Sequence, residues 1–259
     1  MTAQTVDIVP ADAAPSRAGP WKFWGTTLWG LAIIATMVVV GSGGTFAGLL
    51  WLKPDPNLTM PQLEALIFSN SLLLAVIFGA ALACALAVLL LAVRLSGLSA
   101  RDYLGLTLPR RRDLLIGLAA LAALYAIYLL SSRLFAPQAP EWFKGVYRHS
   151  LGADTLPALA VAIVLLAPIG EELIVRGFLL RGWAASRMGP TFAIVLTSAL
   201  WTGMHTQYEP FVLSYIFGIG LLLGWLRQRT GSTLLTMMLH ATQNAVVLAQ
   251  TAVTVWWLG

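Results

Sequence analysis

Seven runs of apolar residues, most of them long enough to cross a lipid bilayer, divide this chain. A transmembrane helix needs about 20 apolar residues, and only helices and closed barrels can satisfy their backbone polar groups inside the hydrocarbon core. The runs predict an all-α, polytopic membrane helix bundle of about seven transmembrane helices, folded as one domain over residues 21–259. They cover about residues 24–52, 65–95, 113–135, 156–183, 190–207, 210–226 and 232–258.

The composition supports a membrane protein and argues against a nucleic-acid-binding protein. Hydrophobic residues make up 58% of the chain and charged residues 10%, which is too apolar for a soluble domain. The net charge of +5 comes from basic residues scattered between the apolar runs, not from one basic patch. Cys84 is the only cysteine, which excludes an intramolecular disulfide and a thiolate metal cluster. Residues 1–20 lack the apolar core of a signal peptide and predict a disordered tail.

The distribution of basic residues predicts the orientation of the chain. Cytoplasmic loops of membrane proteins carry an excess of Lys and Arg. An N-terminus on the inside puts most of the basic residues on the inner side, and we expect a multi-pass protein of the bacterial cytoplasmic membrane in contact with lipids. The inner set is Arg17, Lys22, Arg94, Arg101, Arg110, Arg111, Arg112, Arg181, Arg187, Arg227 and Arg229, and the outer set is Lys53, Arg133, Lys144 and Arg148. The inner loop 98–106 has the spacing of a short interfacial helix.

Two adjacent carboxylates and a guanidinium interrupt the fourth run, at Glu171, Glu172 and Arg176. A charged side chain at the centre of a membrane helix costs roughly 2.5–3.5 kcal/mol, so such a set indicates a functional site that faces the protein interior. Glu172 and Arg176 are four residues apart and can pair on one helix face, whereas Glu171 points about 100° away. Pro168 should open the helical hydrogen bonding toward the carbonyl of Val164.

Three further polar residues lie deep in the later runs. His205 is near the end of the fifth run, and His240 and Asn244 share one helix face of the seventh because they are four residues apart. At about 1.5 Å per residue from the inner ends, Glu171, His205 and Asn244 lie at comparable depths, about 24, 22 and 18 Å. These side chains are therefore expected to meet in one pocket.

Such a set has the parts of an amide hydrolase. A carboxylate in a low-dielectric site can act as a general base for water, and a neutral histidine beside it can orient that water or pass the proton onward. A second histidine with an asparagine can donate hydrogen bonds to a developing oxyanion, where loss of one donor typically costs on the order of 10²–10³ in rate.

The order of three motifs over residues 160–250 resembles the CAAX protease and bacteriocin-processing family of intramembrane endopeptidases. The motifs are Glu171-Glu172-x-x-x-Arg176-Gly177, Trp201-x-x-x-His205 and His240-x-x-x-Asn244. The resemblance implies that Glu171 activates water with the help of His205, that His240 and Asn244 polarise the scissile carbonyl, and that Glu172 and Arg176 support them. The second motif usually opens with Phe, and Trp201 would keep an aromatic wall of the substrate pocket with a different width. The eukaryotic prenyl-protein proteases of the family are usually counted with one more span.

The resemblance leaves the cofactor open. Family members have also been described as metalloproteases, and Glu171, His205 and His240 would be the three protein ligands of a catalytic Zn²⁺. The chain lacks a His-Glu-x-x-His motif, and these three residues lie on separate predicted helices, so we favour catalysis without a metal.

Three functions remain open at this point. The first is an intramembrane endopeptidase that cleaves a membrane-associated protein, a lipidated protein or a peptide precursor. The second is a proton-coupled membrane transporter in which the Glu-Glu-Arg-His set forms a proton relay. The third is a partner-binding scaffold that retains the set for structural reasons and shows neither activity. The absence of a recognisable inverted repeat argues against the transporter.

Overall fold

A computed structural model describes residues 19–257 except 60–61, 64–65, 68–69 and 136–140. Every regular element in this part of the chain is a helix, as the apolar runs predict. The predicted disordered tail falls almost entirely on residues 1–18, which lie outside the described residues.

The elements follow the predicted runs closely. They are α1 (Phe23–Leu52), α3 (Ser71–Leu95), α4 (Ala100–Leu104), α5 (Arg111–Phe135), α6 (Glu141–Gly152), α7 (Leu156–Val161), η1 (Ala162–Leu166), α8 (Ala167–Glu172), η2 (Leu173–Leu179), α9 (Leu180–Ala184), α10 (Gly189–Gly203), α11 (Pro210–Thr230) and α12 (Thr233–Trp257). Elements α7 to α9 join end to end and form the fourth run. The helix α6 was not predicted, because its segment is polar enough to read as a connection.

Five of the described helical segments are long and apolar enough to cross a membrane, which leaves the prediction of seven spans unconfirmed. The five are Phe23–Leu52, Leu72–Leu95, Arg111–Phe135, Leu156–Ala184 and Pro210–Thr230. The helix α10 has 15 residues and reaches about 22 Å, which is short of a hydrocarbon core of about 30 Å. The helix α12 has 25 residues, but His240, Gln243 and Asn244 lower its mean hydropathy. The side of the membrane that holds the N-terminus stays a prediction.

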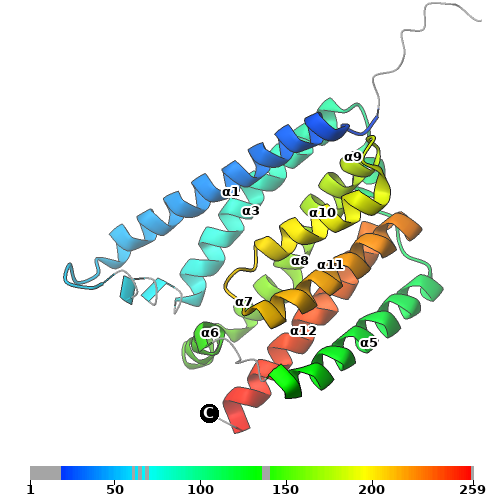
Figure 1. Cartoon of the computed structure of the whole chain (residues 1–259). Helices are drawn as coiled ribbons and strands as arrows, with labels where there is room; N and C mark the ends of the chain where they lie inside the picture. The colour runs from blue at the N-terminus through cyan, green and yellow to red at the C-terminus, as the bar shows by residue number, and fades with distance from the viewer. Residues whose placement is uncertain (1–18, 60–61, 64–65, 68–69, 136–140, 258–259) are drawn as a thin grey trace, which may run out of the picture.

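The fourth run lies between two packed regions. Figure 1 shows α1 and α3 side by side in one region, and α5, α10, α11 and α12 running alongside one another in the other. Ile174 and Phe178 of η2 pack in the core cluster with α1, α3 and α4, whereas Val175 packs in the cluster with α5, α10, α11 and α12. The polar residues of the fourth run are therefore held between two apolar cores.

The inner loop 98–106 forms a helix that is more buried than an interfacial segment. Ser99 caps α4 by accepting a hydrogen bond from the Asp102 N–H. Tyr103 is fully buried and stacks on Phe178 with ring centroids 5.4 Å apart. Burial raises the pKa of Tyr103 to about 12. The loop therefore anchors one end of the bundle to η2.

Candidate active site

Two π-helical stretches, η1 and η2, bracket the short helix that carries Glu171 and Glu172. A π-helix pairs each N–H with the carbonyl five residues earlier, and such stretches are frequent at functional sites. Pro168 has no N–H, so the carbonyl of Ile163 lacks its π-helical donor. The Asn244 Nδ2 donates to this oxygen at 2.9 Å. The carbonyl that takes a new partner is thus Ile163, not Val164 as an α-helical count predicted.

Glu172 is a fully buried carboxylate with two cationic or hydrogen-bonding partners. Its Oε1 accepts from Arg176 Nη1 at 2.8 Å and lies 3.0 Å from His240 Nδ1. Arg176 is also fully buried, and its Nη2 donates to the Gly220 carbonyl at 3.4 Å. The pairing of Glu172 with Arg176 that the four-residue spacing predicts is present in the structure.

Glu171 lies in a different environment from its neighbour. It is half-buried, and its Oε2 accepts a hydrogen bond from Trp201 Nε1 at 2.6 Å. No ion pair of Glu171 is found among the described residues. The two adjacent carboxylates thus differ in exposure and in the charge of their partners.

Trp201 is the residue that brings the predicted site residues together. Beyond the hydrogen bond to Glu171, its ring lies 4.5 Å from the Arg176 guanidinium carbon. The imidazoles of His205 and His240 meet it edge-on, with centroids 5.0 and 5.2 Å away. Its side chain is only 3% exposed, which makes it an interior contact of the cluster, and its place in the wall of a substrate pocket stays a prediction.

His205 lies in the turn after α10, because that helix ends at Gly203, four residues earlier than the predicted run. Its Nδ1 is 2.8 Å from the Trp201 carbonyl oxygen. A carbonyl only accepts, so Nδ1 carries the proton and a neutral His205 has its lone pair on Nε2. His205 is half-buried and is the more accessible of the two histidines.

Tyr208 joins the cluster and was missed by the sequence analysis. Its ring stacks on His205 with centroids 6.2 Å apart. Burial and, to a smaller extent, the negative charge of Glu171 raise the pKa of Tyr208, which places the phenol in the electrostatic reach of that carboxylate. An aromatic residue three positions after a motif histidine was the available sequence signal.

The three residues proposed as zinc ligands do not form a metal site in this arrangement. Among the described residues, no three His, Cys, Asp or Glu side chains gather closely enough to hold one ion. Glu171 is bound by an indole, His205 by a backbone carbonyl and His240 by a second carboxylate. No step is derived through a metal.

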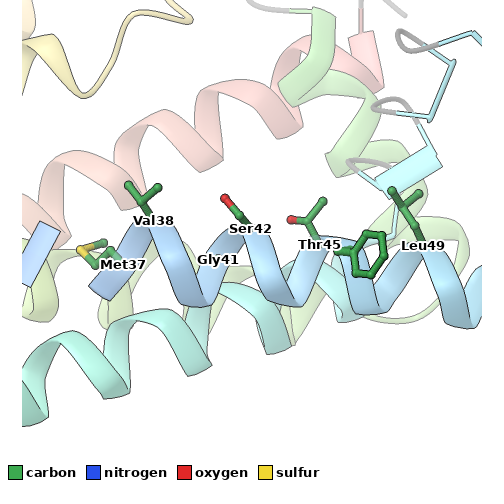
Figure 2. A pocket seen from close by; sticks show the side chains of 7 residues that line it. Met37, Val38, Gly41, Ser42, Thr45 and Leu49 are labelled. Atoms are coloured by element: carbon green, nitrogen blue, oxygen red, sulfur yellow. The ribbon is translucent and has the colours of Figure 1, made fainter. Parts of the chain in front are cut away.

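The cluster is also separate from a large surface hollow of about 480 Å³. That hollow follows one face of α1 from Met37 to Leu49 and includes Ser42 and Thr45 (Figure 2). All of its lining residues belong to α1, and none is a predicted site residue. It therefore offers no acid or base for catalysis.

Comparison with known proteins agrees with the three motifs. Residues 153–246 match the family described as type II CAAX prenyl endopeptidase Rce1-like. An Escherichia coli protein named "Uncharacterized 24.3 kDa protein" is 31% identical over 124 residues. The matched stretch covers 47% of this chain and 56% of that protein. No solved structure shows a significant match. Residues 153–246 are therefore similar to the Rce1-like family of type II CAAX prenyl endopeptidases, and the match to the Escherichia coli protein spans about half of its length.

Proposed function

We propose that the protein is an intramembrane endopeptidase that hydrolyses a peptide bond with Glu171 as the base. The observation that supports this proposal most directly is that two adjacent carboxylates differ in burial and in their hydrogen-bond partners. Glu172 is fully buried against Arg176 and His240, whereas Glu171 is half-buried and held by one neutral donor. A carboxylate without a cationic partner is the better proton acceptor of the two. The Rce1-like match of residues 153–246 supports the same class of reaction.

Water activation is assigned to Glu171 together with His205. The Trp201 indole contacts both residues and fixes the carboxylate through one oxygen. The Nδ1 proton of His205 is engaged by a backbone carbonyl, so its Nε2 can accept from water or carry the proton onward to the leaving amine. Glu171 and His205 would then share one water molecule without touching each other.

Oxyanion stabilisation is assigned to His240 and Asn244. The Nδ1 of His240 faces a carboxylate oxygen, which accepts, so this nitrogen carries a proton. Donation from Nε2 as well requires the doubly protonated imidazolium. Asn244 gives one amide hydrogen to Ile163 and keeps the second for the substrate.

The substrate class follows from the setting of the site. The proposed base Glu171 lies on Leu156–Ala184, a segment long and apolar enough to cross a membrane, so the cleaved bond belongs to a membrane-associated protein, a lipidated protein or a peptide precursor. The membrane is proposed to be the bacterial cytoplasmic membrane, with the N-terminus inside. The basic residues grouped at one end of the bundle support this orientation.

A comparison of the protein termini that form in isolated membranes tests the proposal. Membranes containing the wild type, Glu171→Gln or Glu209→Gln are incubated, and new protein termini are identified by mass spectrometry. Glu209 is exposed and provides the control for loss of a carboxylate. We expect a set of termini that appears with the wild type and with Glu209→Gln and disappears with Glu171→Gln. Termini that persist in Glu171→Gln would refute the endopeptidase.

The same proteins distinguish the transporter alternative. Wild type and Glu171→Gln are reconstituted into liposomes, and proton flux is followed with an internal pH dye. A flux that depends on Glu171, without any difference in protein termini, would favour the proton-coupled transporter.

A further inference from the structure

A second polar cavity, of about 250 Å³, lies at the end of the bundle where α9 and α11 finish. Three arginines line it, Arg176 at its inner part and Arg181 and Arg227 nearer the helix ends. Pro20, just before α1, also lines it, so three separate segments enclose the space. The cavity is independent of the proposed base Glu171.

Arg227 is a buried guanidinium that the fold holds in a fixed position. Its side chain is 4% exposed, and its Nε donates to Thr233 Oγ1 at 2.8 Å. Thr233 in turn donates to the carbonyl of Leu104. The guanidinium occupies the space that a side chain at Gly105 would need. The Nη2 of Arg227 is buried and has no hydrogen-bond partner.

Two of the three arginines of this cavity have no counter-charge among the described residues. Arg176 pairs with Glu172, whereas no ion pair of Arg181 or Arg227 is found in the described part of the chain. Two guanidiniums on one small cavity repel each other, and a buried charge without a partner is unfavourable. An anion in the cavity would remove both penalties.

The chemistry of the donors indicates which anion fits. Arginine forks match the oxygens of phosphate and form strong, charge-assisted hydrogen bonds. The volume exceeds that of a few water molecules at about 30 Å³ each, so a phosphate with part of a headgroup can enter. Further arginines lie at the same end of the bundle and would attract an anionic membrane surface. They are Arg94, Arg101, Arg110, Arg111, Arg112, Arg187 and Arg229.

We propose that Arg181 and Arg227 form a binding site for a phosphate group, supplied by the headgroup of an anionic phospholipid. The site would tie α9, α11 and the segment before α1 together through one lipid. It contains none of the residues assigned to water activation or to the oxyanion and borders the hydrolytic site only through Arg176, so it stands or falls separately from the endopeptidase.

Lipid-dependent thermal unfolding tests the site on the full chain in detergent. Phosphatidylglycerol is compared with a galactosyl diacylglycerol of the same acyl chains, which has no phosphate, and with inorganic phosphate alone. We expect phosphatidylglycerol to raise the unfolding temperature of the wild type, and the galactolipid to leave it unchanged. Protection by inorganic phosphate at the same concentration as the lipid would support the phosphate site and assign it to a soluble source. No protection by either phosphate compound would overturn it.

Matched variants separate the cavity from general surface charge. Arg181→Gln is expected to lower the apparent affinity for phosphatidylglycerol by about tenfold or more, the effect of one lost charged hydrogen bond. Arg187→Gln removes the same charge from an exposed position outside the cavity and should leave the affinity unchanged. Equal losses in the two variants would overturn the site.

Discussion

Arg176 and Arg227 are both buried guanidiniums, but the regions around them solve the problem of a buried charge in different ways. Around Arg176, the fold supplies Glu172 as a counter-ion, the Gly220 carbonyl as an acceptor and Trp201 as an aromatic neighbour. Around Arg227, the fold supplies the hydroxyl of Thr233 as a hydrogen-bond partner but no counter-ion among the described residues. Each guanidinium has one buried nitrogen without a partner, Nε in Arg176 and Nη2 in Arg227, so the counter-ion is what distinguishes them.

This difference indicates a different role for each of the two regions. A charge neutralised internally gives a rigid frame that can position neighbouring side chains, and Arg176 sits beside the carboxylate proposed as the base. A charge left open at the edge of a cavity requires an external partner to be satisfied. The two regions are therefore expected to respond in opposite ways to loss of the positive charge.

Replacement of each arginine by methionine gives the largest expected contrast. Arg176→Met leaves Glu172 buried with only His240 and should destabilise the protein by about 3–5 kcal/mol. Arg227→Met removes a charge that has no internal partner and should cost about 1 kcal/mol, the value of one hydrogen bond. Denaturant unfolding in lipid-free detergent measures both. The double variant Glu172→Gln, Arg176→Met should recover part of the loss, and equal costs for the two single variants would contradict the comparison.

Alanine substitutions at two glycines test how firmly the surroundings of Gly105 are packed, and we expect a smaller effect on stability than for the arginine variants. Gly105 and Gly231 both have positive φ, at 65° and 70°, so alanine at either position adds roughly 1–2 kcal/mol of backbone strain. A Cβ at Gly105 would also meet the Arg227 guanidinium and the backbone carbonyl oxygen of Gly231, whereas nothing lies near a Cβ at Gly231. We expect Gly105→Ala to unfold at a lower temperature than Gly231→Ala. The same unfolding temperature for both would show that neither the guanidinium nor the Gly231 carbonyl is held firmly against Gly105.

Trp201→Phe has the smallest expected effect. It tests whether the hydrogen bond from the Trp201 indole positions the proposed base Glu171. Phenylalanine keeps an aromatic ring beside Arg176 but loses the N–H that binds Glu171. Loss of this hydrogen bond leaves the carboxylate less firmly positioned against the water that it activates. The rate of peptide cleavage should therefore fall by about tenfold or less, while the unfolding temperature changes little. An unchanged cleavage rate would show that the indole does not position the base.

Several features of the site could be predicted from the sequence because they depend on spacing along one helix. The pairing of Glu172 with Arg176 and the shared face of His240 and Asn244 are of this kind. The role of Trp201 could not be predicted in this way, since its contacts come from two other segments of the chain. Arg227 was counted as a topology signal, and only the packing of residues 104–105 over it shows that it is buried.

The fold, like the site, was predictable only where it depends on the local sequence. Apolar length predicted the main helices, whereas it could not predict the π-helical stretches η1 and η2. In η1, the Ile163 carbonyl takes its donor from Asn244 of α12, which lies 81 residues later in the chain. It also missed α6, whose residues are too polar to mark a span.

The central claim is that Glu171 performs the chemistry while Glu172 holds the structure. The most direct test measures peptide cleavage and unfolding temperature on the same purified samples of Glu171→Gln and Glu172→Gln. The account predicts that Glu171→Gln unfolds at nearly the wild-type temperature and cleaves nothing, whereas Glu172→Gln unfolds at a clearly lower temperature. Cleavage by Glu171→Gln at the wild-type rate would contradict the account.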